Sequence, residues 1–201
     1  GTGICTGVVI DQYSVLTASH CFLSGYASVD VSTFAGTRRA SRVVLHPGFS
    51  AAQFEQGGAL VNDAALVFVD APLGVSSSPL LLSRSPIVGE EAVVSGFGDD
   101  SQSGGSGIMR AGNASVASVT AQHVIIEYKN SESHPCPGDS GGPLLVRQGG
   151  VFAVVGVVSQ SDPSVPLDRV CSKGDITLYT STQDPSILSF IQQYVPNAGG
   201  I

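Results

Sequence analysis

The segment Gly138-Asp139-Ser140-Gly141-Gly142-Pro143 decides how the rest of the sequence is interpreted. A serine hydroxyl that acts as a nucleophile needs a tight, exposed turn and nearby backbone N–H groups that can bind an oxyanion. Glycines on both sides of Ser140 allow an unusual turn and a close approach of the backbone to a substrate carbonyl. The alternative is a plain surface turn, because Gly, Asp and Ser all favour turns. The segment makes Ser140 a candidate nucleophile.

Two further segments contain the groups that such a serine requires. In Val15–Cys21, a strand-like run ends in a corner of small residues that carries His20. In Asn62–Val67, Asp63 stands directly before an apolar run. Taken alone, the histidine is more often structural, and the acid is more often a turn or cap. A catalytic serine, however, needs a base, and the base needs a carboxylate that fixes its tautomer. Together the three segments predict His20, Asp63 and Ser140 as one catalytic set.

The four cysteines are an even number without a CxxC pair, which argues against a zinc site. Two disulfides formed in an oxidising compartment are the better interpretation. Three pairings are possible. We favour Cys5–Cys21 with Cys136–Cys171, because each would join strands that flank one half of the suspected site.

At this point the chain resembles the trypsin/chymotrypsin family of serine proteases. The family order of His, Asp and Ser is kept, and its GDSGGP motif is unchanged. The family's TAAHC motif corresponds to Thr17–Cys21, its DIAL to Asp63–Leu66, and its SGWG turn to Ser95–Gly98. Val157-Val158-Ser159 is similar to the strand that binds the substrate backbone. The resemblance covers about Ile4 to Val195, with substitutions typical of a distant member.

The resemblance implies a role for several further residues. The N–H groups of Gly138 and Ser140 would form the oxyanion hole, and Ser159 would lie beside Asp63. One disulfide would brace the His20 corner and the other the specificity pocket. The substrate-binding positions implied by the family pattern are His134, Ser159, Ser161 and Thr177.

The expected fold is all-β, with a single C-terminal helix. Short runs rich in Val, Ile, Leu and Thr recur between Gly, Pro, Ser and Asp residues, and residues 186–195 have helical spacing after a capping Asp184. The resemblance implies two antiparallel β-barrels packed around an active-site cleft. We expect a first lobe over residues 1–83 and a second over 84–201, with the Pro- and Ser-rich stretch 71–86 as the linker.

Composition excludes several classes of function. The net charge of -7 opposes binding to nucleic acid, and no apolar run is long enough to span a bilayer. We expect no cofactor and no metal site, and a protein or peptide as the substrate. The cysteines and the absence of a leader segment at Gly1 predict a secreted protein, extracellular or periplasmic.

Two departures from the family pattern affect the predicted activity. The family's Ile/Val N-terminus, whose amine pairs with the acid before the nucleophile, has no counterpart here. We therefore expect a missing N-terminal segment to pair with Asp139, which otherwise would turn to other donors and disturb the oxyanion hole. In the pocket, His134 replaces the Asp of trypsin. With Ser161 and Thr177 on the walls, this predicts cleavage after small or short polar residues rather than Arg or Lys, with acidic residues accepted if His134 is protonated.

Two other functions remain alternatives at this stage. A catalytically impaired homologue could act as a binding module, and only the absent N-terminus favours it. An acyl hydrolase of unrelated fold is opposed by the order of the three catalytic residues.

Overall fold

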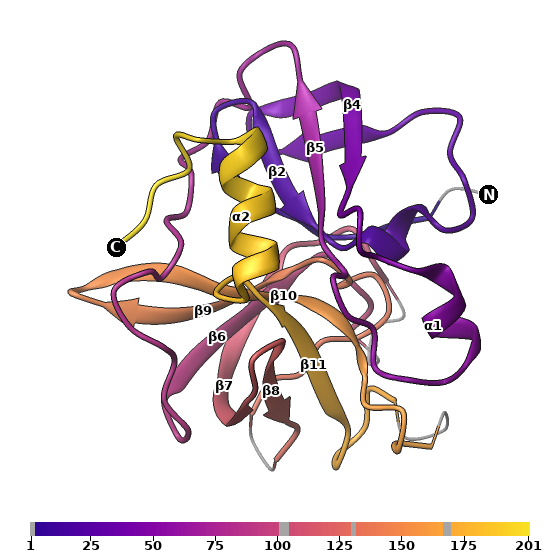
Figure 1. Ribbon diagram of the computed structural model, residues 1–201, viewed down its shortest axis with the longest axis vertical. Coiled ribbons are helices and arrows are strands. Elements are labelled where there is room, and N and C mark those ends of the chain that lie inside the picture. Colours follow the sequence, from indigo (N-terminus) through magenta and orange to yellow (C-terminus); the bar gives the residue numbers. More distant parts are fainter. Residues whose placement is uncertain (1–2, 101–104, 130–131, 167–169) are drawn as a thin grey trace.

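The computed structural model describes residues 3–100, 105–129, 132–166 and 170–201. The chain is built mainly from antiparallel strands, as Figure 1 shows. The strands are β1 (Val8–Asp11), β2 (Ser14–Thr17), β3 (Asp30–Thr33), β4 (Gly36–Leu45), β5 (Ala65–Val69), β6 (Glu91–Gly96), β7 (Arg110–Val119), β8 (His123–Glu127), β9 (Pro143–Gln148), β10 (Val151–Ser161) and β11 (Ile176–Ser181). The helices are a 3-10 turn (Ser19–Phe22), α1 (Ala51–Glu55) and α2 (Pro185–Tyr194).

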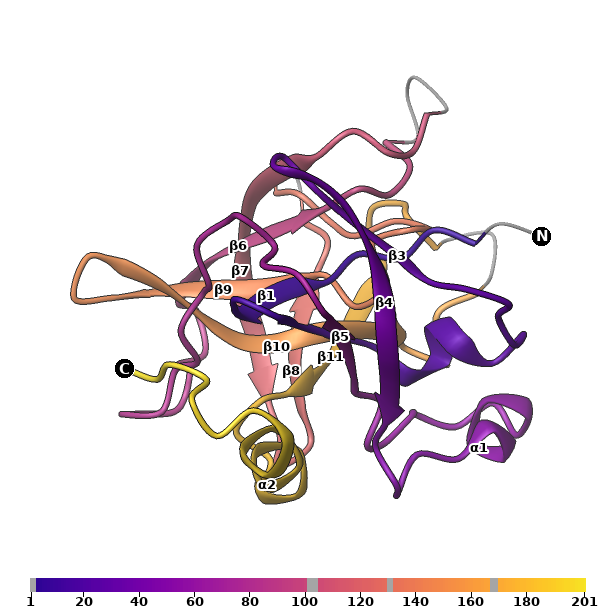
Figure 2. The same ribbon diagram turned by 90° about the horizontal axis from the view of Figure 1, so that it is seen from above.

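The strands form two sheets, which confirms the all-β class and the predicted architecture. The second sheet is a closed barrel in the order β10-β11-β8-β7-β6-β9. The first sheet has five strands in the order β1-β2-β5-β4-β3 and is curled but not closed. Figures 1 and 2 show this sheet on one side of the barrel, with α2 beside both. The first lobe is therefore a half-barrel, and the second is a complete barrel.

Strand β10 has the most influence on the site. It is eleven residues long and pairs with β9 on one side and β11 on the other. Its run of Val residues is buried on both faces from Ala153 to Ser159, which explains the continuous apolar sequence. A register shift between Val158 and Gln160 bends the strand beside Ser159. Bulges of this kind often redirect a side chain next to an active site.

One packed core connects the two sheets. It contains Leu16 and Leu66 from the first sheet, Val157 from β10, and Ile187 and Ile191 from α2. The apolar face of α2 thus fills the junction between the sheets. Because interiors are close-packed, such a junction fixes the position of one sheet relative to the other.

The stretch proposed as a linker is anchored in the protein interior. Leu73, Leu80 and Leu81 within it are almost fully buried, and Leu80 forms a bridge with Val154 of β10. The predicted helix is present, with Asp184 accepting a hydrogen bond from the Ser186 amide at 2.8 Å. No helix in the described part of the chain is long and apolar enough to cross a membrane.

The sequence prediction missed β3, the first part of β4, and α1. The β3–β4 hairpin is exposed on alternate residues and carries polar side chains, so it lacks the apolar run that identified the other strands. The prediction of a single helix is corrected, because α1 adds a short helical turn before the segment that carries Asp63.

Candidate active site

His20 and Asp63 form a hydrogen-bonded pair. His20 Nδ1 lies 2.7 Å from Asp63 Oδ2, and the backbone N–H of His20 donates to Oδ1 at 2.9 Å. The Ser159 hydroxyl also donates to Oδ2, at 2.6 Å. The Asp63 side chain is fully buried, whereas that of His20 is 16% exposed. Because the carboxylate accepts at Nδ1, that nitrogen carries the proton and Nε2 keeps a free lone pair.

The corner that carries His20 is tied to the segment that carries Asp63. His20 lies in the 3-10 turn that follows β2, and the preceding Ser19 donates from its hydroxyl to Ala64 O at 2.6 Å. On the other side, Asn62 has a positive φ of 57°, which turns the chain directly before Asp63. The two catalytic candidates are therefore held by their immediate neighbours, one of which, Ser19, is among the substitutions that mark this chain as a distant family member.

The turn that carries Ser140 packs against the same corner. Gly141 has a φ of 79°, and a Cβ added to it would lie 2.0 Å from Thr17 Oγ1 and 2.8 Å from the Ala18 nitrogen. Only glycine allows this close approach in that conformation. In addition, Ser140 O accepts a hydrogen bond from Thr6 N at 2.8 Å. These contacts bring the nucleophile candidate to the His20 corner, although no hydrogen bond joins the Ser140 hydroxyl to His20 within the described residues.

Thr6 is a connecting residue that the sequence did not identify. Its hydroxyl donates to Gly138 O at 3.0 Å and accepts from Phe97 N at 3.0 Å, while its carbonyl accepts from the Thr17 hydroxyl at 2.7 Å. Thr6 therefore links the nucleophile turn to both sheets. Its only signal in the sequence is its position next to Cys5.

The backbone amides of Gly138 and Ser140 are free donors among the described residues, since neither forms a hydrogen bond there. Pro137 O accepts from Asp99 N at 2.9 Å. Because carbonyl and N–H point in opposite directions across a trans peptide, the Gly138 N–H points away from Asp99. Two such donors in one turn can bind a developing oxyanion.

Asp139 is satisfied by backbone amides. Its Oδ1 accepts from Gly98 N at 2.7 Å and its Oδ2 from Cys136 N at 2.9 Å. A Cβ at Gly98 would lie 2.6 Å from Asp139 Cγ, so this glycine is needed for the contact. No ion pair involves Asp139 in the part of the chain that the structure describes. The carboxylate is thus bonded to other donors, and the Gly138 amide is not among them.

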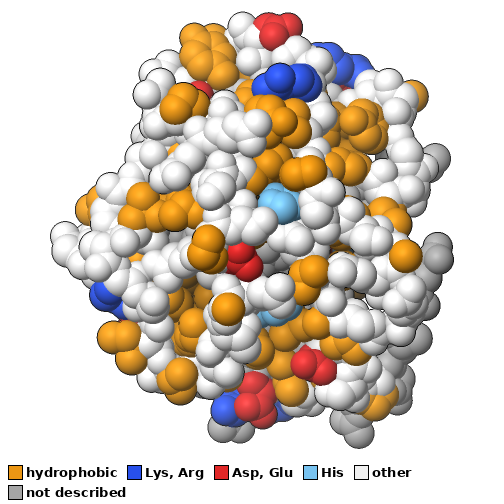
Figure 3. Space-filling model, viewed as in Figure 1, with side chains coloured by type: hydrophobic (Ala, Val, Ile, Leu, Met, Phe, Trp, Pro, Cys, Tyr) orange, Lys and Arg blue, Asp and Glu red, His pale blue; other side chains and the backbone are white. Residues whose placement is uncertain are grey.

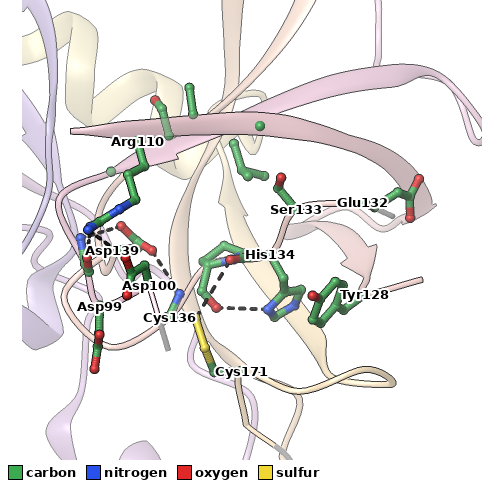
Figure 4. A pocket seen from close by; sticks show the side chains of 17 residues that line it. Asp99, Asp100, Arg110, Tyr128, Glu132, Ser133, His134, Cys136, Asp139 and Cys171 are labelled. Carbon is green, nitrogen blue, oxygen red and sulfur yellow. Dashed lines mark hydrogen bonds and ion pairs between the residues drawn. A yellow bond between two sulfur atoms is a disulfide. The ribbon is translucent and has the colours of Figure 1, made fainter. Parts of the chain in front are cut away.

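A cavity of about 280 Å³ lies behind the nucleophile turn and is lined by Asp139, His134, Tyr128 and Arg110. Figure 4 shows Arg110, Asp99, Asp100 and Asp139 gathered on one side of it and His134 with Tyr128 on the other. Arg110 donates to Asp100 at 2.8 Å and to Gly98 O at 3.1 Å. None of the three catalytic candidates lines this cavity.

The predicted substrate-binding residues form a second buried cluster. Thr177 Oγ1 lies 2.7 Å from His134 Nε2, and Ser161 pairs with Thr177 in the β10–β11 ladder. The Ser161 hydroxyl donates to Asp175 Oδ2 at 3.2 Å. Burial lowers the pKa of His134, an effect that the nearby Asp175 carboxylate partly opposes. A protonated His134 at neutral pH, the condition for accepting acidic residues, is therefore disfavoured.

The structure contains the disulfides Cys5–Cys21 and Cys136–Cys171. The first ties the chain next to Thr6 to the His20 turn. The second joins the nucleophile loop to the segment before β11, and Figure 4 shows it at the edge of the cavity. Figure 3 shows charged side chains sparsely scattered among hydrophobic and uncharged ones on one face, in keeping with a charged content of 12%.

Comparisons with known proteins agree with this arrangement. The family model described as Trypsin matches residues 1–185. The chain is 27% identical to "Trypsin" of Sus scrofa over 200 residues, covering 86% of this chain and 83% of that protein. It is 31% identical to "Trypsin alpha" of Drosophila melanogaster over 185 residues, covering 79% and 68%. Against "Trypsin zeta" of Drosophila erecta it is 27% identical, covering 71% of this chain but only 60% of that protein.

The family match extends from residue 1 to the first residue of α2, so both sheets and all three catalytic candidates fall inside it. With the closed barrel, the curled sheet and the C-terminal helix, it shows that this chain belongs to the Trypsin family of serine proteases.

Proposed function

We propose that the chain is a secreted serine endopeptidase in which Ser140 is the nucleophile, His20 the general base and Asp63 the group that orients the base. The fully buried Asp63 carboxylate, bonded to His20 Nδ1 at 2.7 Å, carries this proposal. A buried carboxylate is costly unless it is hydrogen-bonded, and Asp63 uses both of its oxygens for bonds that position His20. That arrangement suits an imidazole that must accept a proton at Nε2.

The reaction has two stages. Ser140 Oγ attacks the carbonyl carbon of the peptide bond while His20 Nε2 takes the hydroxyl proton, which gives a tetrahedral oxyanion. The imidazolium, stabilised by Asp63, then gives its proton to the leaving amine, and the C–N bond breaks to leave an acyl-enzyme. In the second stage, His20 takes a proton from water while the water oxygen attacks the ester. Ser140 then regains a proton from His20, and the carboxylic acid product leaves.

The oxyanion hole would consist of the Gly138 and Ser140 amides. Both are free of other hydrogen bonds among the described residues, so they can donate to the oxyanion without first losing a partner. Removing one such donor in comparable enzymes costs about a hundred- to thousandfold in kcat.

Substrate binding would involve β10 near Ser159 and a pocket formed by His134, Ser161 and Thr177. The hydroxyls of Ser161 and Thr177 are bonded to buried neighbours, which leaves a short site. We therefore expect cleavage after small or short polar residues. Dominant cleavage after Arg or Lys in a peptide library would contradict this expectation.

Asp139 would be the contact point for an N-terminal segment. Its carboxylate lines the cavity behind the nucleophile turn and is held by amides rather than by a cation, so an ammonium group could bind there. N-terminal sequencing and intact mass of active material would identify such a segment. Full activity from a protein that begins at Gly1 would argue against it.

Labelling with a fluorophosphonate tests the central proposal. The reagent should modify Ser140 in the unaltered protein, with the adduct located by mass spectrometry, and should fail to modify the Ser140→Ala and His20→Ala variants. Ser133→Ala, which changes a serine outside the catalytic set, is the control and should be labelled normally. If the unaltered protein hydrolyses no peptide and Ser140 is not labelled, the chain is a non-catalytic homologue.

A further inference from the structure

The substrate-binding cluster contains a buried carboxylate, that of Asp175, which the predicted pocket did not include. Asp175 is fully buried, and its Oδ2 accepts from Cys171 N at 2.6 Å and from the Ser161 hydroxyl at 3.2 Å. His134 Nδ1 lies 3.6 Å from the same oxygen. The cluster is continuous with the catalytic set, because Ser159, which binds Asp63, is two residues before Ser161 on β10.

The hydrogen bonds of His134 are compatible with a neutral imidazole. Nδ1 lies 2.9 Å from Pro135 O, which can only accept, so Nδ1 carries a proton. Nε2 lies 2.7 Å from Thr177 Oγ1 and can accept the hydroxyl proton. Both ring nitrogens thus have a hydrogen-bond partner when the imidazole carries a single proton. The ring also stacks on the ring of Tyr128, with 5.4 Å between the two centroids. Burial also lowers the pKa of His134, as noted above.

Asp175 is only partly satisfied. Its Oδ1 is buried and has no hydrogen-bond partner among the described residues. A buried acceptor without a donor is costly, and such groups often mark sites where a ligand contributes the missing bond. Of the two bonds to Oδ2, the one from the Ser161 hydroxyl is the longer. Rotation of that hydroxyl would free Oδ2 as a second acceptor on this carboxylate.

We propose that Asp175 determines specificity by selecting, at the residue whose carbonyl is attacked, a short side chain that donates a hydrogen bond, such as Asn, Ser or Thr, and by rejecting Asp and Glu. This inference rests on the proposed peptidase function. An ionised Asp175 beside a neutral imidazole would give the cluster a net negative charge, and the Asp139 carboxylate also acts electrostatically on His134. A substrate carboxylate would meet like charge and no donor, whereas an amide or hydroxyl would satisfy Asp175.

Two peptides that differ only in Asn or Asp at the cleaved position test the proposal, because these side chains have the same shape and differ in charge and in one donor. The ratio of kcat/KM for Asn over Asp, measured near pH 7.5, should be at least about tenfold in the unaltered protein. Asp175→Asn removes the charge and places an N–H donor at the site of one carboxylate oxygen. It should lower the ratio by at least about tenfold.

The matched control is Asp162→Asn. Asp162 lies one residue after Ser161 but bonds locally to Ser164, so the variant makes the same change in net charge outside the cluster. Its ratio should stay within about twofold of that of the unaltered protein. A similar loss in Asp162→Asn would assign the selectivity to long-range charge and overturn the proposal.

The ratio is measured within one variant, so a general loss of activity does not affect it. If Asp175→Asn does not fold, as judged by circular dichroism, the ratio of the unaltered protein still decides: cleavage after Asp as fast as after Asn overturns the proposal. If cleavage occurs and Asp175→Asn keeps the original ratio, the proposal fails while the peptidase function stands. If no peptide is cleaved and Ser140 is not labelled, both fail.

Discussion

Asp63 and Asp175 are two buried carboxylates in similar surroundings, and they differ in two respects. Each is fully buried, accepts a backbone N–H, lies beside a histidine Nδ1, and accepts a serine hydroxyl from β10. Both oxygens of Asp63 have partners, and the histidine contact is 2.7 Å. One oxygen of Asp175 has none, and its histidine contact is 3.6 Å.

Under the proposed mechanism, this difference separates a carboxylate that positions the protein's own general base from one that can still bind a substrate group. A group that must stay in one position during the reaction benefits from complete hydrogen bonding. A group that discriminates between substrates must leave one bond to be formed by the substrate. The comparison predicts that changes at the two sites have effects of very different kind and size.

The largest effect is expected at Asp63. Asp63→Asn keeps the shape but favours the wrong imidazole tautomer, so kcat should fall by about four orders of magnitude with little change in KM. Asp175→Asn should change the ranking of substrates instead. Steady-state kinetics with the Asn and Asp peptides would measure both effects. If Asp63→Asn lowered kcat by less than tenfold, the two carboxylates would not differ in role as proposed.

A smaller effect is expected at the two serines of β10. Ser159→Ala deletes a hydrogen bond of 2.6 Å to Asp63, and such bonds to charged groups contribute about 1.5–3 kcal/mol. We expect kcat to fall by about tenfold or more. Ser161→Ala deletes the weaker bond to Asp175 and should alter mainly KM. If both variants lowered kcat equally, the two carboxylates would serve the same role.

The smallest effect concerns stability and the buried histidine His46. His46 Nδ1 accepts from Gly48 N at 3.1 Å, and its Nε2 lies 3.1 Å from the Ser186 hydroxyl at the start of α2. Burial lowers the pKa of His46, although the Ser186 carbonyl and Asp184 partly oppose this. The folded state therefore binds the proton more weakly than the unfolded chain, whose histidine pKa is about 6.5.

This contribution to stability is complete above about pH 6.5 and is lost as the pH falls through the lowered pKa. His46→Gln should lower the free energy of unfolding by about 1 kcal/mol near pH 7.5. Below pH 7.5, the free energy of unfolding of the variant should also depend less on pH. Urea unfolding at several pH values would measure this. Parallel curves for the variant and the unaltered protein would exclude His46 as the titrating group.

Sequence reasoning found the parts of the molecule that have short, ordered signatures. The segments around His20, Asp63 and Ser140 each combine an unusual residue with fixed neighbours, and the long apolar strands have clear periodicity. The β3–β4 hairpin was missed because it is exposed, and its polar side chains give no apolar alternation. Whether the first sheet closes depends on which strand edges meet, and no local pattern in the sequence reveals this.

Asp175 and Thr6 could not be assigned a role from the sequence for a different reason. Asp175 follows a segment of uncertain alignment between Ser161 and Cys171, so its side chain could not be assigned a direction from spacing. Thr6 acts through contacts with Gly138 and Phe97, which are 132 and 91 residues away in the sequence. Long-range contacts made by ordinary residue types leave no mark in a single sequence.

The placement of both serines on β10 has a consequence for how the protein could change over evolutionary time. Substitutions on this strand alter rate and selectivity together, because Ser159 and Ser161 are two residues apart on one rigid element. The segment Cys171–Asp175 contacts the pocket floor and not Asp63. Substitutions in that segment could therefore change substrate preference while the turnover rate is preserved. The segment is the natural target for a mutant library aimed at altered selectivity.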